Sequence, residues 1–162
     1  MEITDLKSLY VSELQEARSC EAQIADAFEA LGAKASDPAL KELLHAEVPE
    51  AAGHRDRVGE LVAAHGEEPV AHDDQTMRTL LAEADRWARM IGDDGARDAA
   101  LIASAQRVQH YEIALYGSLA AWAKQLGMSD LDTLLKILDE ERAADERLTE
   151  IAKSAVNTQA VA

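Results

Sequence analysis

The chain has 162 residues, with 16 Lys and Arg against 31 Asp and Glu, so its formal net charge is −15. A surface this acidic repels phosphate backbones, which argues against nucleic acid as a partner. Hydrophobic residues make up 48% of the chain and aromatic residues only 4%, and there are three prolines. This composition favours a single helical domain over a sheet protein.

The N-terminus gives no sign of a signal peptide, because Glu2 and Asp5 interrupt any apolar run. No apolar stretch is long enough to cross a membrane. Cys20 is the single cysteine, so no intrachain disulfide can form. These features predict a cytoplasmic protein in which Cys20 is a small core residue rather than a nucleophile.

The first long helix is predicted at about residues 4–31. Thr4 is placed to cap its start, and Gly32 is placed to end it in the left-handed conformation. Its apolar side chains recur at helical spacing, at Leu6, Leu9, Tyr10, Leu14, Ala17, Ile24, Phe28 and Leu31.

The second long helix is predicted to begin with Asp37 as N-cap and Pro38 in its first turn, and to stop around Gly66. Pro49 falls in its interior, where it removes a hydrogen bond at a cost of about 3 kcal/mol. Two readings remain open at this point. A local π-bulge or kink accommodates Pro49, or the helix breaks and His54 lies away from any site.

Residues 67–95 form a long connection, opened and closed by loop signals. Apolar residues at helical spacing predict a short helix within it, at about residues 74–91. Met77, Trp87 and Ile91 on this helix can cover a partner chain.

The second half predicts a third long helix at about 97–126, stopped by Gly127, and a fourth from residue 129 or 130 to about 156. Four long helices, two tight hairpins and one long crossover match the ferritin-like class of four-helix bundle. The prediction is therefore an all-α fold. Its single domain spans residues 1–157, and residues 158–162 form a frayed tail.

One spacing of polar residues occurs in both halves of the chain, at relative positions 0, 29 and 33. The residues are Glu21, Glu50 and His54 in the first half and Glu112, Glu141 and Asp145 in the second. Facing hairpins bring such residues to the middle of a bundle, as in two-metal carboxylate sites. Spacing alone leaves coincidence open, since 31 acidic residues offer many matches and any of them can face water.

Five carboxylates and one imidazole nearly cancel the charge of two divalent ions. Hard oxygen ligands with one imidazole suit iron first and manganese second. Arg18, Gln109 and Tyr116 lie about one turn from Glu21 or Glu112 and can hydrogen-bond a ligating oxygen. Tyr116 remains open between a redox role and a core tyrosine with a satisfied hydroxyl.

Several segments resemble the YciE/YciF family of ferritin-like proteins. They are residues 97–102 and 106–117, which contain the run His-Tyr-Glu-Ile-Ala, together with 20–23, 50–54, 125–127 and 140–148. The resemblance covers nearly the whole chain. It implies a four-helix bundle, commonly dimeric, with a dinuclear metal centre, in bacterial proteins associated with stress.

The resemblance carries the metal-ligand role to the same six residues, with two departures from the pattern of ferritin-like sites. Such sites usually pair a Glu with a His three positions later, whereas Glu50 and His54 are four apart. Asp145 takes the place of the second His. Both departures change which ligand atoms are available and how they can be placed around the metal ions.

The leading prediction is a dinuclear iron or manganese protein, an oxidase or peroxide-scavenging stress protein that acts on oxygen or peroxide as a homodimer. The sequence does not identify catalytic residues. The alternative is a non-catalytic helical-bundle interaction protein whose metal site is empty or structural. An iron-storage cage is disfavoured, because nothing in the chain supplies the elements that would close a hollow assembly.

Overall fold

The computed structural model describes residues 2–70 and 72–161, and no β-strand occurs within them. The helices are α1 (Leu6–Gly32), α2 (Pro38–Ala64), α3 (Gln75–Met90), α4 (Asp94–Leu126) and α5 (Leu131–Ile151), followed by a π-helical turn η1 (Ala152–Val156) and the single turn α6 (Asn157–Gln159). The predicted all-α fold is therefore confirmed. The predicted frayed tail stays a prediction.

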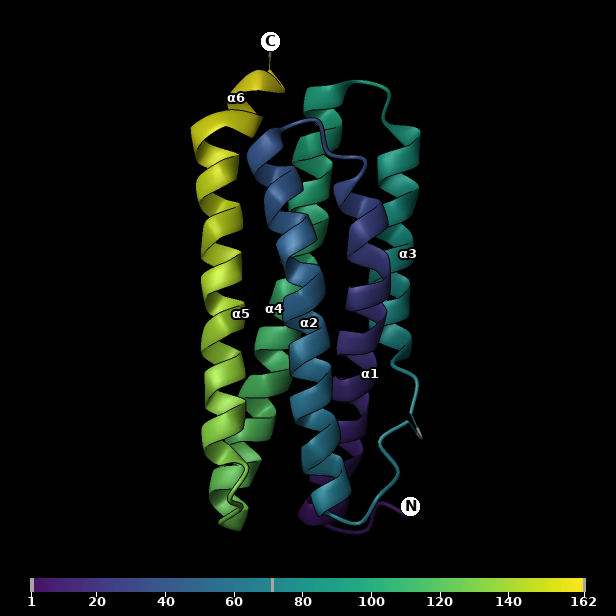
Figure 1. The fold of residues 1–162 in the computed structure, drawn as a ribbon, viewed down its shortest axis with the longest axis vertical. Helices are drawn as coiled ribbons and strands as arrows, with labels where there is room; N and C mark the ends of the chain where they lie inside the picture. Colours follow the sequence, from purple (N-terminus) through teal and green to yellow (C-terminus); the bar gives the residue numbers. More distant parts are fainter. Residues whose placement is uncertain (1, 71, 162) are drawn as a thin grey trace.

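Two helical hairpins pack side by side to form the bundle (Figure 1). The first is made of α1 and α2, the second of α4 and α5, and contacts between α1 and α4 and between α2 and α5 join them. Helix α3 lies against α1 and α4 and carries the chain back along the bundle, so that α4 starts at the same end as α2. This is the long crossover with a short helix that the sequence predicts.

Apolar side chains from all the long helices fill the interior. The largest of those that are fully buried are Tyr10, Leu14, Ile24, Phe28, Leu40, Leu44, Met77, Tyr116, Leu119, Leu134 and Ile137. The prediction that Met77 can cover a partner is wrong, because its side chain faces this core. Trp87 and Met90, also on α3, are exposed.

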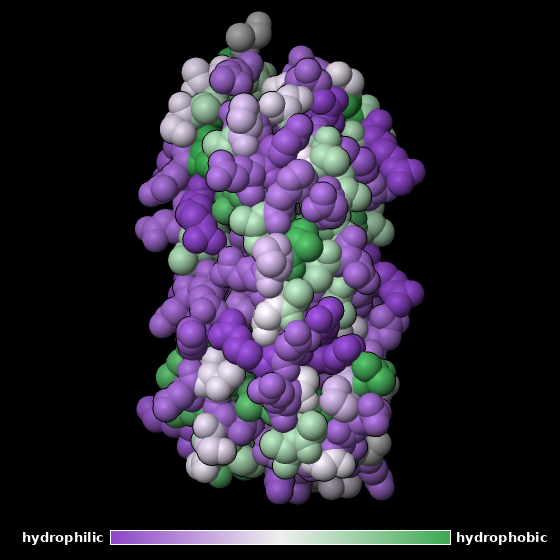
Figure 2. Space-filling view, in the orientation of Figure 1, coloured by the Kyte–Doolittle hydropathy of each residue, from purple (hydrophilic) through white to green (hydrophobic). Residues whose placement is uncertain are grey.

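The outer face that α2 and α5 present is mostly hydrophilic. Figure 2 shows a band of hydrophobic and near-neutral atoms running along this face between the charged side chains. Among the helices described, none combines the length and the apolar character that crossing a membrane requires.

Several helix ends differ from the predicted ones. Helix α4 begins at Asp94 rather than at about residue 97, and α5 ends at Ile151 rather than at about 156. Asp5 caps α1 instead of Thr4, and its carboxylate accepts the N–H of Ser8 at 2.7 Å. The predicted left-handed Gly32 is wrong, because the helix continues through it to a right-handed Ala33. A Cβ at position 32 would lie 2.3 Å from Cδ2 of His45, so a side chain there would require this partly exposed ring to move. At the end of α4 the predicted left-handed stop is confirmed, with φ 65° at Gly127.

Helix α2 runs unbroken through Pro49. The reading in which this proline breaks the helix is wrong, and His54 remains on the inner face with 2% of its surface exposed. A π-bulge at Pro49 is also not found, since α2 is α-helical from Pro38 to Ala64. The described π-helical turn lies at the end of α5 instead.

A buried aspartate fixes the connection between α1 and α2. Both carboxylate oxygens of Asp98 on α4 accept backbone N–H groups from this connection, from Ser36 at 2.8 Å and from Asp37 at 2.7 Å. Because Asp37 is itself the N-cap of α2, Asp98 sets where that helix begins.

A second buried aspartate ties the opposite end of the bundle together. Asp130 precedes α5, but its side chain does not cap that helix. Its carboxylate accepts the hydroxyl of Tyr10 on α1 at 2.7 Å and lies 2.7 Å from Nε2 of His65, which follows α2. This one carboxylate thereby links α1, the end of α2 and the start of α5.

Replacing Asp98 by Ala should destabilise the protein by about 2 kcal/mol, because two backbone N–H groups lose a charged, buried acceptor. Urea denaturation followed by circular dichroism measures this change. Asp94→Ala is the matched control, since Asp94 lies one turn earlier on α4 and its side chain is 72% exposed. The control should change stability by less than about 1 kcal/mol. Equal effects of both substitutions would contradict this role for Asp98.

Candidate metal centre

Three buried side chains from three helices meet in the middle of the bundle. They are Glu21 of α1, His54 of α2 and Glu141 of α5. Nδ1 of His54 lies 2.7 Å from Oε1 of Glu141 and 3.3 Å from Oε1 of Glu21. In the part of the chain that the structure describes, these three form the group whose ligand atoms all lie within 4.8 Å of one another. The group can hold a metal ion.

The orientation of the imidazole follows from its other nitrogen. Nε2 of His54 lies 2.9 Å from Oε2 of Glu140, which also accepts Nη2 of Arg57 at 2.6 Å. A proton on Nε2 donated to Glu140 leaves Nδ1, which faces Glu21 and Glu141, as the nitrogen that would bind a metal ion once the ion displaces its proton. Histidine ligands in metal sites are held in this way by a carboxylate behind the ring.

The carboxylates control the protonation of His54. Burial alone lowers the pKa of an imidazole, but Glu141 and Glu21 outweigh it and raise the pKa of His54 to about 10. Burial also raises the pKa of Glu141 above its ordinary value, while His54 opposes that shift. A proton therefore sits among these groups at neutral pH, at the place where a cation would bind.

Glu112 of α4 adds a fourth buried group. Burial first, and then the charges of Glu141 and Glu21, raise its pKa well above the ordinary value. Its Oε2 atom is buried and has no hydrogen-bond partner among the described residues. An unpaired buried carboxylate oxygen is costly, and a cation would satisfy it. The donor set of buried oxygens and one imidazole nitrogen thus fits iron or manganese.

Glu50 and Asp145 are placed less deeply. Their side chains are 31% and 21% exposed. Oε2 of Glu50 lies 3.8 Å from Nη2 of Arg147, and Oδ1 of Asp145 lies 3.4 Å from Nε2 of His110. The structure thus brings Glu21, His54 and Glu141 together, while Glu50 lies beside Arg147 and Asp145 beside His110. The Oδ1 atom of Asp145 is nevertheless buried and has no hydrogen-bond partner among the described residues. Their role as ligands stays a prediction.

Sequence reasoning missed Glu47. This residue lies two turns before His54 on the same face of α2 and is buried. Burial and the charge of Glu141 raise its pKa to about 8. The seven-residue spacing to His54 was the available signal. The repeat between the two halves does not include Glu47, because the corresponding residue of the second half is the apolar Leu138.

Two of the three residues predicted to hydrogen-bond the ligands have partners different from those that spacing suggested. Tyr116 donates its hydroxyl to Oε1 of Glu21, at 2.5 Å across the bundle. Gln109 donates to Oε2 of Glu47 at 3.3 Å. Arg18 is half-buried on α1. Tyr116 is completely buried, and burial with Glu21 raises its pKa well above the ordinary value, so it remains a neutral donor.

Comparison with known proteins assigns the chain to a family. Residues 5–161 match the family described as a domain of unknown function, DUF892. The chain belongs to DUF892. Protein YciF of Escherichia coli (strain K12) is 35% identical over 162 residues, which are 99% of this chain and 98% of that protein. The resemblance to the YciE/YciF family is therefore confirmed.

Solved structures agree with this assignment. The crystal structure of the E. coli stress protein YciF matches this DUF892 chain with a TM-score of 0.89 and 34% identity, over 96% of this chain and 99% of that one. YcfI from Rhodopseudomonas palustris matches with a TM-score of 0.87 and 33% identity, over 91% and 95% of the two chains. The predicted ferritin-like fold is confirmed.

Replacing Glu140 by Gln in this DUF892 protein should weaken divalent-metal binding about tenfold, because the amide fixes the imidazole of His54 less strongly. Titration of the metal-free protein with cobalt, followed by visible absorption, measures the affinity. The matched control is Glu146→Gln, an exposed position on the same helix. If both variants bind cobalt as tightly as the wild type, Glu140 does not orient a ligand.

Proposed function

We propose that this protein binds two divalent metal ions and uses them to react with oxygen or peroxide. Iron is the first expectation for the metal and manganese the second. The proposed ligands are Glu21, Glu50, His54, Glu112, Glu141 and Asp145. The observation that carries the proposal is the buried group of Glu21, His54 and Glu141. The buried, unpartnered Oε2 of Glu112 supports it, since the charges of Glu141 and Glu21 act on that carboxyl and raise its pKa.

The charge of the cluster supports metal binding. Glu21, Glu47, Glu112 and Glu141 are all buried, and His54 is the buried imidazole among them. Burying several like charges costs several kcal/mol unless cations or protons compensate. Two divalent ions supply that compensation, which gives a physical reason for placing these acids in the core.

The chain's own residues bind, orient and exclude water. Tyr116 holds one oxygen of Glu21, and Glu140 holds the imidazole of His54. Ala17 and Ile24 lie one turn either side of Glu21 and are buried, so they keep the surroundings of the cluster dry. Bound iron or manganese would supply electron transfer to oxygen or peroxide, which no side chain of this cluster performs alone.

The relatives give the proposal its biological setting. The E. coli relative YciF is described as a stress protein. We extend that description to this chain, since removal of peroxide by a carboxylate-bound metal pair is one chemistry that suits a stress protein.

Metal content tests the proposal directly. Protein purified without chelator, from cells supplied with iron and manganese, should carry about two of these ions per chain by elemental analysis. Glu112→Ala should lose most of this metal while the bundle stays folded, because removing a buried carboxylate relieves repulsion. The exposed Glu60→Ala is the control and should retain the metal.

Two outcomes would overturn this proposal. Wild-type protein that carries no metal and takes up no ferrous ion under anaerobic conditions contradicts the function. An unchanged metal content in Glu112→Ala contradicts the assignment of the site.

The second candidate role, an association between two copies of this chain, rests on α3. The side chain of Trp87 on α3 is 40% exposed. Hollows of about 280 and 220 Å³ adjoin it, and both are also lined by Arg107 of α4. Exposed aromatic side chains beside such hollows are typical of protein interfaces.

We therefore expect a homodimer in which α3 contacts the partner. Trp87→Glu should shift the protein toward a monomer in sedimentation equilibrium, since a buried charge opposes association. Leu135→Glu is the control, because Leu135 on α5 is equally exposed but lies on another helix. A wild-type monomer, or a dimer that both variants leave intact, contradicts this interface.

A further inference from the structure

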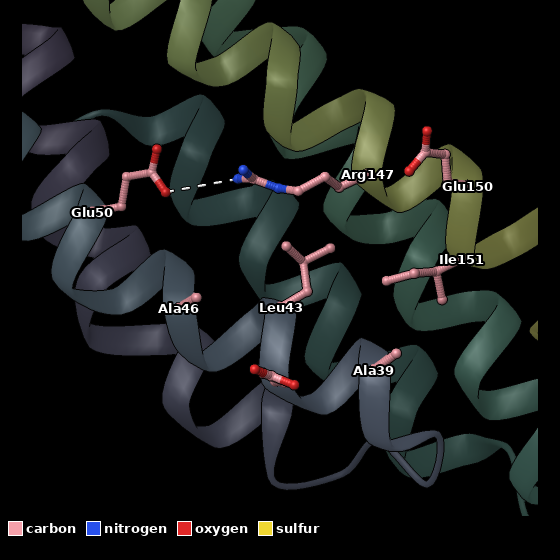
Figure 3. A pocket seen from close by; sticks show the side chains of 8 residues that line it. Ala39, Leu43, Ala46, Glu50, Arg147, Glu150 and Ile151 are labelled. Atoms are coloured by element: carbon pink, nitrogen blue, oxygen red, sulfur yellow. Dashed lines mark ion pairs between the residues drawn. The ribbon is translucent and has the colours of Figure 1, made fainter.

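A groove runs along the surface between α2 and α5, with a volume of about 410 Å³. Leu43 and Ala46 of α2 and Ile151 of α5 contribute apolar walls (Figure 3). Glu42 and Glu150 also line it, one from each helix. The groove is therefore largely apolar, with acidic side chains on both sides.

Glu50 connects this groove with the buried cluster. Its side chain lines the groove and is partly exposed, whereas Glu112 and Glu141 are buried. Glu47, one turn earlier on α2, is buried, and Nη2 of Arg147 lies within 3.8 Å of both acids, so the two carboxylates lead from the groove toward the interior. A cation in the groove meets Glu50 before it meets the inner carboxylates.

Arg147 of α5 reaches across the groove toward α2, as Figure 3 shows for its ion pair with Glu50. Its Nη2 atom lies 3.8 Å from Oε2 of Glu50 and 3.7 Å from Oε1 of Glu47. Both distances exceed a hydrogen bond, and the Arg147 side chain is 48% exposed. Such ion pairs are weak, so this side chain can leave its position at little cost.

We propose that divalent cations reach the cluster through this groove, and that Arg147 closes the groove by holding Glu47 and Glu50. Arg147 is a positioning residue in this arrangement. Glu42 and Glu150 attract hydrated cations to the groove, and the guanidinium repels them until it swings outward. The inference rests on the proposed metal-binding function and adds the route by which the ions enter.

A simpler role for Arg147 makes a different prediction. If Arg147 only balances the charge of Glu47 and Glu50, its removal strengthens metal binding, so ions load faster and leave more slowly. If Arg147 closes the route, its removal lowers the barrier in both directions. Loading and release then both become faster.

The test measures cobalt entering and leaving the metal-free full-length protein. Stopped-flow visible absorption follows loading, and transfer to excess chelator, at concentrations where the rate no longer depends on chelator, follows release. Arg147→Gln should load about fivefold faster, as expected when one positive charge is removed near a divalent ion. It should also release cobalt several-fold faster, with the final amount of cobalt per chain unchanged.

Arg142→Gln is the matched control, since it removes the same charge from an exposed position of the same helix. It should load and release cobalt as the wild type does. The double variant Glu42→Gln/Glu150→Gln should load about threefold more slowly, while Glu60→Gln, an exposed position on α2, should not.

The outcomes separate the route from the function. Wild-type protein that takes up no cobalt overturns the proposed function and the route with it. Normal uptake with Arg147→Gln loading no faster than Arg142→Gln, or releasing cobalt more slowly than the wild type, overturns the route alone. Thermal unfolding of the metal-free variants establishes that each compared protein is folded.

Discussion

The structure depends on one constraint, the burial of several carboxylates around a single imidazole. Glu21 and Glu141 lie close enough to His54 to raise its pKa to about 10, and Glu112 lies beside them with an oxygen unpaired in the described structure. Such a cluster is unfavourable for a bundle that needs only a core, because Leu or Met would fill the same space at no electrostatic cost. The acids are therefore explained by what they can bind.

The rest of the bundle holds these side chains in place against their mutual repulsion. Each of the four helices of the bundle contributes at least one acid or His54 to the cluster, so a shift of any helix along its axis would separate them. Asp98 fixes one end, through the start of α2, and Asp130 fixes the other, through Tyr10 and His65. Helix α3 lets both hairpins enter the bundle in the required directions.

Most of the fold could be predicted from the sequence, because caps, glycines and apolar spacing are local signals. Asp37 and Gly127 mark their helix ends as expected. Gly32 does not end α1, and its close neighbour is tertiary, since the ring of His45 on α2 lies against it. The sequence leaves open whether Pro49 breaks its helix; α2 continues through it, since packing along its whole length outweighs one lost hydrogen bond.

The candidate site was less predictable, because spacing along a helix identifies a face but not the partner across the bundle. The repeat between the halves picked out Glu21, His54 and Glu141, yet it passed over Glu47, which has no acidic counterpart. Spacing along α5 does not indicate a role for Glu140, because this residue contacts Nε2 of His54 on another helix.

Cys20 offers a different view of the same core. This thiol is fully buried beside the acids, and burial followed by the charge of Glu112 raises its pKa well above the ordinary value. It can become a thiolate only when the bundle opens. Its rate of alkylation by an added thiol reagent therefore reports opening events in the centre of the molecule, and no cysteine has to be introduced for the purpose. Comparing the alkylation rates of Cys20 with and without metal would measure how strongly bound ions oppose the separation of the four helices.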